Sequence, residues 1–162
     1  MTKRRRSVGE PFSGEIIPPV RLNEMQEKAC TKIRDLFNGH ETVLLHGVTS
    51  SGKTEIYIHL MHEQLARGRQ VLYMLPEIAL TSQIIERLRR HFGDTIGVFH
   101  SRLTTAARRE VWRKVSDGTL RAVLGVRSSL FLPFRDLGLI IVDEEHKFWW
   151  CSSMTRRTLS CP

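Results

Sequence analysis

Short apolar runs alternate along the chain with amphipathic stretches, and turn residues separate the two. The apolar runs predict strands at residues 43–45, 71–75, 96–99, 121–124 and 139–142. The amphipathic stretches predict helices at residues 24–37, 55–67, 82–92 and 105–115, and the first of these follows a possible capping box of Asn23 and Gln26. Strands that alternate with helices are joined by right-handed crossovers, so we expect an α/β fold with a parallel sheet and helices on both faces.

A glycine-rich loop lies between the first predicted strand and the next helix. Residues 47–54 read Gly-Val-Thr-Ser-Ser-Gly-Lys-Thr and fit the spacing G-x-x-x-x-G-K-[ST]. In such loops the backbone N–H groups turn inward around nucleotide phosphates, so we expect Lys53 to neutralise phosphate charge and Thr54 to bind Mg²⁺. A chance glycine-rich turn is the alternative, but the flanking elements favour a nucleoside triphosphatase. The predicted phosphate-binding residues are Gly47, Thr49, Ser51, Gly52, Lys53 and Thr54.

An acidic cluster follows the last apolar run. Residues 139–142 end directly in Asp143-Glu144-Glu145-His146. In P-loop enzymes a carboxylate after a buried strand holds Mg²⁺, and an adjacent carboxylate orients or deprotonates the attacking water. We therefore predict that Asp143 holds the metal and that Glu144 acts on the water. Taken alone, such a cluster is more often a solvated turn or a helix start, but the P-loop favours the functional interpretation.

Polar residues also follow the other predicted strands, where parallel sheets bind their ligands. The candidates are Pro76 and Glu77, His100 and Ser101, and Arg127 and Ser128. Hydroxyl and guanidinium groups there can bind the phosphates of a nucleic-acid strand. Each loop taken singly is as readily a polar turn with a capping residue, but together they favour a motor surface.

Charge and composition indicate the kind of partner and the compartment. The net charge of +8 favours a polyanion, with nucleic acid the obvious one, although solvated helix faces account for about half of the basic residues between the two motifs. The cysteines Cys30, Cys151 and Cys161 lack disulfide or metal spacing, and His59 and His62 lack a carboxylate or cysteine partner at ligand spacing. With no run as long as a membrane span, we expect a cytoplasmic protein with free thiols.

Five segments occur in a fixed order, namely G-V-T-S-S-G-K-T-E, L-P-E-I-A-L-T, H-S-x-L, G-V-R-S-S-L-F-x-P-F and D-E-E-H. In this order they resemble the bacterial primosomal replication-restart helicases, the primosomal protein N′ or PriA family of the second helicase superfamily. The resemblance runs from about Leu22 to His146. RecG-like branch-migration helicases and transcription-repair coupling enzymes share the P-loop and a similar acidic box, but Pro76-Glu77-Ile78 argues against them.

The resemblance implies a RecA-like P-loop lobe, the first motor lobe of a helicase that uses ATP and Mg²⁺. It implies 3′-to-5′ translocation on single-stranded or forked DNA, with primosome and replication-restart proteins as partners and no membrane. It also implies residue roles. Gln26 would contact the adenine, a role that competes with capping, and His146 would couple the nucleotide site to the DNA site. The residues that would contact DNA are Pro76, Glu77, Arg127 and Ser128.

The sequence departs from the family in two places within the motifs and again after His146. Ser50 stands where many relatives have glycine, and Val126 where many have threonine. Residues 147–162 have no helical or strand period and no family likeness, which suggests a broken reading frame and a missing second lobe. We therefore expect a tail or linker at residues 1–20, an ATP-binding lobe at 21–146 and an atypical, non-native segment at 147–162.

A fragment of this kind is expected to bind Mg-ATP weakly and DNA non-specifically, with negligible unwinding alone. Two other functions compete with that of a motor lobe. A non-catalytic ATP- and nucleic-acid-binding module is the main alternative to a motor lobe. A P-loop kinase or transport ATPase is disfavoured by the D-E-E-H box and by the arginine-serine loop at Arg127 and Ser128.

Overall fold

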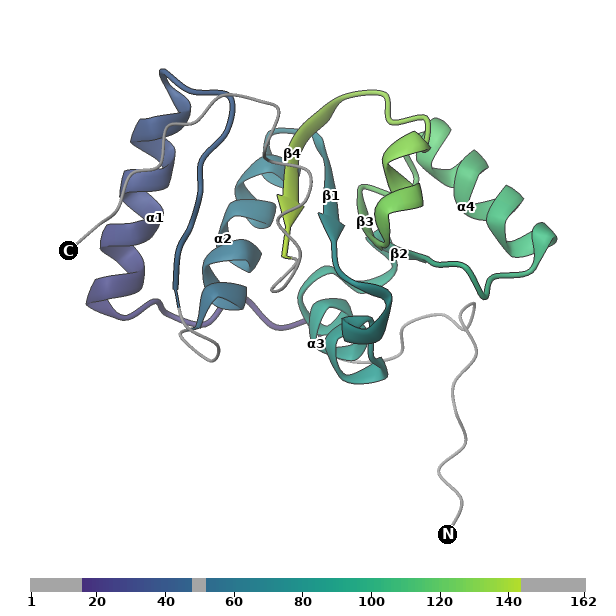
Figure 1. Ribbon diagram of the computed structural model, residues 1–162, viewed down its shortest axis with the longest axis horizontal. Helices are drawn as coiled ribbons and strands as arrows, with labels where there is room; N and C mark the ends of the chain where they lie inside the picture. Colours follow the sequence, from purple (N-terminus) through teal and green to yellow (C-terminus); the bar gives the residue numbers. More distant parts are fainter. Residues whose placement is uncertain (1–15, 48–51, 144–162) are drawn as a thin grey trace, which may run out of the picture.

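A four-stranded parallel sheet forms the centre of the molecule (Figure 1). The computed structural model describes residues 16–47 and 52–143. The strands are β1 (Gln70–Met74), β2 (Ile96–Phe99), β3 (Ala122–Gly125) and β4 (Leu137–Val142), in the order β2-β3-β1-β4. The helices are α1 (Glu24–Phe37), α2 (Lys53–Ala66), α3 (Ser82–Phe92) and α4 (Thr105–Ser116), with short 3₁₀ helices η1 (Glu77–Ala79), η2 (Gly93–Thr95) and η3 (Arg127–Phe131).

Both faces of the sheet are covered, as its continuous apolar strands require. Alternate residues of β1 point to opposite faces. Val71 and Tyr73 pack in one cluster with residues of α2 and α3, whereas Leu72 and Met74 pack in another with Val115 of α4. The predicted α/β fold with helices on both faces is therefore confirmed.

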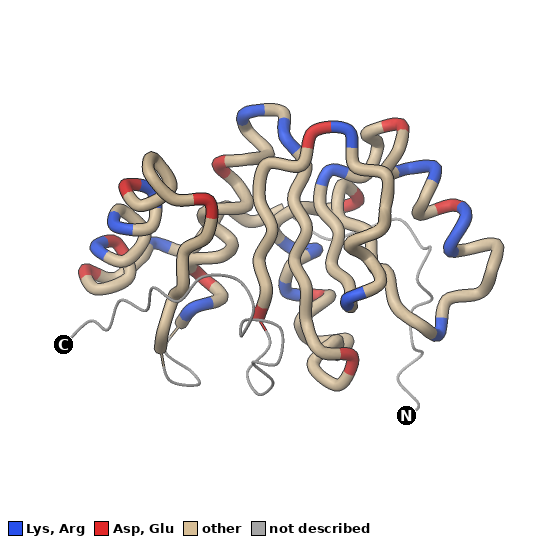
Figure 2. Tube along the Cα trace, turned by 45° about the horizontal axis from the view of Figure 1, so that its top comes forward, with Lys and Arg blue, Asp and Glu red and all other residues tan. Residues whose placement is uncertain are grey.

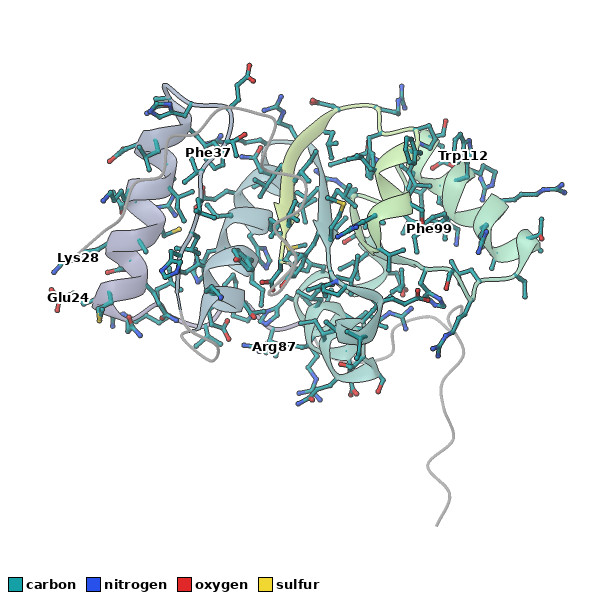
Figure 3. All side chains as sticks on the ribbon, in the orientation of Figure 1. Glu24, Lys28, Phe37, Arg87, Phe99 and Trp112 are labelled. Carbon is teal, nitrogen blue, oxygen red and sulfur yellow. The ribbon has the colours of Figure 1, made fainter. Side chains whose placement is uncertain are left out.

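Helix α1 packs on α2 and lies at one end of the molecule, beyond the sheet (Figure 1). Cys30 and Ile33 of α1 are buried against Ile56 and Leu60 of α2. Burial raises the pKa of the Cys30 thiol, which is free. The opposite side of α1 is solvated, where Glu24 and Lys28 form an exposed ion pair at 2.6 Å (Figure 3).

Local sequence signals set the starts of three helices. At α1 the predicted capping box is present, since the Asn23 side chain accepts from the backbone of Gln26 and the Gln26 side chain accepts from the backbone of Asn23, both at 2.9 Å. Thr81 and Thr104 cap α3 and α4 through their side-chain oxygens. The bounds predicted for these helices agree with the structure to within a residue.

The strand predicted at residues 43–45 is wrong, because the structure assigns no strand to that segment. Within the described residues, β4 pairs only with β1 and is an edge of the sheet. Val43 and Leu45 instead pack their side chains into the cluster between α1 and α2, together with Leu139. The apolar pattern thus identified side chains that are partly buried, but they are buried by helices and not by a paired strand.

Gln70 links several elements at the edge of the sheet opposite the carboxyl ends of the strands. Its side chain is buried and donates to the carbonyl oxygens of Val115, at 3.0 Å, and Leu120, at 2.8 Å. The side-chain oxygen Oε1 of Gln70 accepts a hydrogen bond from the backbone N–H of Arg135 at 2.7 Å. A buried amide with this many partners fixes the chain where it enters β3 and β4.

The segment before α1 touches α3. The backbone N–H of Ile17, within the predicted tail or linker, donates to the carbonyl oxygen of Arg90 at 2.8 Å, and the Ile17 carbonyl oxygen lies 3.0 Å from Nδ1 of His91. In the part of the chain that the structure describes, no helix is long and apolar enough to cross a bilayer.

Candidate nucleotide site and nucleic-acid interface

The carboxyl ends of the parallel strands meet at one edge of the sheet, and most of the described candidate residues lie there. Strands β1 and β4 run toward the lower edge of the view in Figure 1, where α2 begins and where α3 lies. The backbone N–H of Leu75 donates to Gly125 at 2.9 Å, and that of Val126 donates to Phe99 at 3.2 Å, so the loops after β1, β2 and β3 start side by side. This is the edge at which α/β sheets bind ligands.

Helix α2 begins at the end of the glycine-rich loop, and no side chain of the described residues caps its first N–H groups. Its N-cap is Gly52, in the left-handed conformation at φ 76°. Nζ of Lys53 donates to the Gly47 carbonyl oxygen at 2.8 Å and so spans the loop. A helix start with uncapped N–H groups and an adjacent lysine is suited to an anion such as a phosphate.

Gln26 lies against the same loop while it caps α1. Its Nε2 donates to the Gly52 carbonyl oxygen at 3.2 Å, and its Oε1 accepts from Asn23. The capping function predicted for Gln26 is therefore present, and the same side chain also reaches the glycine-rich loop. Contact with an adenine stays a prediction.

Asp143 follows β4 directly and continues its ladder, since its backbone N–H donates to Met74 at 2.9 Å. Its carboxylate Oδ2 accepts a hydrogen bond of 2.8 Å from the hydroxyl of Tyr73. Burial, and then the negative charge of Asp143, raise the pKa of Tyr73 far above its usual range, so the phenol stays protonated and donates. The side chain of Thr54, at the start of α2, lies close to the same phenol.

The structure therefore brings Thr54 and Asp143 together through Tyr73, although they belong to two motifs far apart in sequence. Sequence reasoning missed Tyr73, because the residue counted only as part of an apolar strand. The available signal was its polar tip near the carboxyl end of a strand otherwise made of apolar residues from Val71 to Leu75.

The donor set at this point fits Mg²⁺. A hydroxyl and a carboxylate are the hard oxygen ligands that Mg²⁺ takes, and the ion usually keeps waters and substrate phosphates as its other ligands. Within residues 16–47 and 52–143, no group of three or more His, Cys, Asp or Glu side chains gathers to form an all-protein metal site. Thr54 and Asp143 are thus suited to a metal that a nucleotide helps to hold.

The loops after β1 and β2 are joined by side chains. The Ser101 hydroxyl donates to the Glu77 carboxylate, and the Arg108 guanidinium donates to the Ser101 carbonyl oxygen. His100 Nδ1 accepts from the backbone N–H of Arg102 at 3.2 Å. Two of the predicted nucleic-acid contacts, Glu77 and Ser101, are therefore direct partners at this edge.

The other candidates lie close by on η1 and η3. Pro76 precedes η1, and Arg127 and Ser128 form the exposed start of η3. The turn into η3 depends on Gly125, because a Cβ at that position would lie 2.5 Å from the Ser129 hydroxyl and 3.1 Å from the Phe99 carbonyl oxygen. Ser129 itself is buried and donates to the Val126 carbonyl oxygen, so it has a structural role.

Four predicted site residues lie outside the described residues, namely Thr49, Ser51, Glu144 and His146. An open hollow along α1, lined by Glu24, Lys28 and His59 among others, contains none of the residues predicted for nucleotide or nucleic acid. The candidate site is therefore the lower edge of the sheet and not this hollow.

Basic residues are spread over the helices and are mixed with acidic ones (Figure 2). Several are paired, as in the ion pairs of Arg113 with Asp117 and Lys114 with Glu110 on α4. Arg87 of α3 pairs with Glu55 in the first turn of α2 and so ties α3 to the helix that follows the glycine-rich loop (Figure 3). The charge of the described part is thus partly neutralised locally.

A parallel sheet with helices on both faces, a P-loop sequence before α2 and an acidic strand end facing α2 together define a RecA-like α/β lobe. The sequence pattern of the DEAD/DEAH box helicases matches residues 23–152, which is most of the chain. The chain belongs to the DEAD/DEAH box helicase family.

Curated relatives support the more specific resemblance seen in the motifs. The chain is 43% identical over 131 residues to the replication restart protein PriA of Bacillus subtilis, covering 80% of this chain and 16% of that protein. It is 47% identical over 125 residues to PriA of Rickettsia conorii, covering 77% of this chain and 19% of that protein. It is also 44% identical over 125 residues to PriA of Synechocystis, covering 77% of this chain and 15% of the relative. The chain thus spans less than a fifth of each of these relatives.

Proposed function

We propose that this chain is the ATP-binding first motor lobe of a DNA helicase that acts in replication restart. The observation that carries the proposal is the meeting of the two nucleotide motifs, where Tyr73 donates to Asp143 of the acidic strand end and lies close to Thr54 of the P-loop helix. The identity to PriA proteins supports the replication-restart role. The proposed substrate is single-stranded or forked DNA in the bacterial cytoplasm, with other replication-restart proteins as partners.

The described residues suggest how the nucleotide is held. Lys53, which now donates to Gly47, would turn to the β- and γ-phosphates, and the uncapped N–H groups of α2 would donate to them. Thr54 and Asp143 would hold Mg²⁺, which neutralises phosphate charge during transfer to water. We propose Glu144 as the residue that orients the attacking water and His146 as the coupling residue, on the basis of the motif alone. Gln26 would contact the adenine.

We further propose that the strand-end loops bind the DNA backbone. Arg127 and Ser128 at the exposed start of η3 would donate to phosphates, while Pro76, Glu77, His100 and Ser101 would shape the adjoining surface. Because the same edge also carries Thr54 and Asp143, movement of these loops on nucleotide binding would change the grip on DNA.

Nucleotide binding and hydrolysis by the 162-residue chain, with and without single-stranded DNA, test the proposal. Lys53→Ala removes a charge-assisted hydrogen bond to phosphate worth about 1.5–3 kcal/mol, so Mg-ATP affinity should fall roughly 10- to 100-fold. Lys28→Ala on the exposed side of α1 is the matched control and should bind as the wild type does.

The DNA dependence separates motor from binding module. Turnover that rises with single-stranded DNA and is lost in Lys53→Ala would support a motor lobe. Nucleotide binding without turnover would support a non-catalytic module, and equal affinity in wild type and Lys53→Ala would contradict a P-loop site altogether.

A further inference from the structure

Tyr73 lies between the two nucleotide motifs, and neither motif contains it. Its side chain is 1% exposed and packs in the core against α2, where its ring meets the ring of Tyr57 edge-on at 5.6 Å. The parallel register sets Tyr73 beside Ile141 of β4. Residues two apart on a strand share a face, so Asp143 extends the same face as Ile141, and the long tyrosine side chain reaches it.

The Tyr73 hydroxyl lies close to a side chain from each of the two motifs. As a donor, the hydroxyl bonds to Oδ2 of Asp143 at 2.8 Å. The Thr54 side chain also lies close to this hydroxyl. Tyr73 therefore lies between the carboxylate of the acidic strand end and the hydroxyl of the P-loop helix.

We propose that Tyr73 is a positioning residue that fixes the Asp143 carboxylate, beside the Thr54 hydroxyl, in the orientation needed to hold Mg²⁺ with a nucleotide. The bond from Tyr73 uses Oδ2 of Asp143 and leaves Oδ1 out of this interaction. The proposal rests on the proposed nucleotide site and adds a partner in the outer shell of the metal ligands.

A positioning residue of this kind acts on metal affinity more than on nucleotide affinity. Partners that orient metal ligands typically change metal affinity by about 10- to 100-fold when they are removed. In the proposed site the phosphates would be held by Lys53 and by the N–H groups of α2, and no bond described above joins these groups to Tyr73. Loss of the tyrosine hydroxyl should therefore weaken the Mg²⁺-dependent part of nucleotide binding and leave the nucleotide affinity without Mg²⁺ unchanged.

The test is Tyr73→Phe in the full 162-residue chain, with Tyr57→Phe as the matched control, since these are the two tyrosines of the sequence. The affinity for a fluorescent ADP analogue is measured in EDTA and across a Mg²⁺ titration. In Tyr73→Phe, the Mg²⁺ concentration that gives half of the Mg²⁺-dependent increase in affinity for the analogue should rise about tenfold. The affinity in EDTA should be unchanged. Tyr57→Phe should match the wild type in both conditions.

The other possible results contradict either the inference or the proposed function. If Tyr73→Phe binds with a wild-type Mg²⁺ dependence, or loses affinity equally in EDTA and in Mg²⁺, Tyr73 has only a packing role and the inference is overturned. If the wild type itself does not bind the analogue, the proposed function fails and the inference falls with it.

A measurement on the wild type keeps the inference testable if Tyr73→Phe does not fold. In protein labelled with ¹³C at the tyrosine ring, the two signals are assigned with the Tyr57→Phe variant. Addition of Mg²⁺ to the ADP-saturated chain should shift the Tyr73 signal and leave that of Tyr57 in place. An unmoved Tyr73 signal in a chain that binds Mg-ADP would overturn the inference.

Discussion

Gly52 and Gly68 share an uncommon backbone conformation but differ in what surrounds them. Their φ angles are +76° and +83°, in the left-handed region that L side chains rarely adopt. A Cβ on Gly68 would meet nothing within 4 Å, whereas one on Gly52 would come to 2.2 Å from Nε2 of Gln26. Substitution of the two glycines therefore distinguishes the energetic cost of a left-handed residue with a Cβ from the contribution of the Gln26 contact.

Alanine at each glycine tests that separation. Gly68→Ala should lower the free energy of unfolding by about 1–2 kcal/mol, the usual penalty of a left-handed residue with a Cβ. Gly52→Ala should lower it by roughly 1 kcal/mol more, because Gln26 must leave the Gly52 carbonyl oxygen and that hydrogen bond is lost. Urea unfolding of both variants measures the difference. Equal losses would mean that the Gln26 contact contributes nothing to stability.

At the scale of elements, the interface between α2 and α3 contains a histidine whose proton affinity depends on packing. His62 of α2 lies with its ring 4.5 Å from that of Phe92 and 6.4 Å from that of His91 on α3. Its Nε2 is buried and makes no hydrogen bond with any of the described residues. Burial, and then the nearby His91 and His59, lower the pKa of His62 below its ordinary value of 6.5.

This shift predicts a loss of stability in acid. The folded state binds the His62 proton less readily than the unfolded chain, so the contribution of a neutral His62 is fully present above the ordinary value of 6.5. It declines as the pH falls below that value toward the lowered pKa. His62→Phe, which keeps a ring against Phe92, should reduce the drop in the urea midpoint between about pH 7.5 and about pH 5. The exposed control His40→Gln should keep the full drop, and a drop unchanged in His62→Phe would count against the argument.

Most elements of the lobe were predictable from the sequence because their signals are local. Capping residues such as Asn23 and Thr81 mark helix starts, and runs such as residues 96–99 mark buried strands. The segment at residues 43–45 has the same apolar signal, yet strand pairing depends on which backbone lies beside it, and no local pattern encodes that. Tyr73 was missed for a related reason, since its importance comes from the register of β1 and β4 and not from its neighbours in sequence.

At the scale of the whole molecule, β4 leaves an apolar edge exposed within the described part of the chain. It pairs with β1 on one side only, and its Ile140 and Val142 are 43% and 57% exposed. Backbone groups along an unpaired edge, next to exposed β-branched side chains, favour pairing with another chain. We therefore expect this edge to promote association between copies as the concentration rises.

Ile140→Lys tests that expectation without altering the residues of the candidate site. A lysine on the edge strand opposes pairing through its charge, so association measured by light scattering over a concentration series should fall severalfold. The substitution is at an exposed position, and the thermal midpoint should change little, as for surface changes of about ±0.5 kcal/mol. Met25→Lys is the matched control, because Met25 is 83% exposed and belongs to α1 and not to the sheet. Association reduced equally by both variants would point to net charge as the cause, and association reduced by neither would show that the β4 edge is not where copies meet.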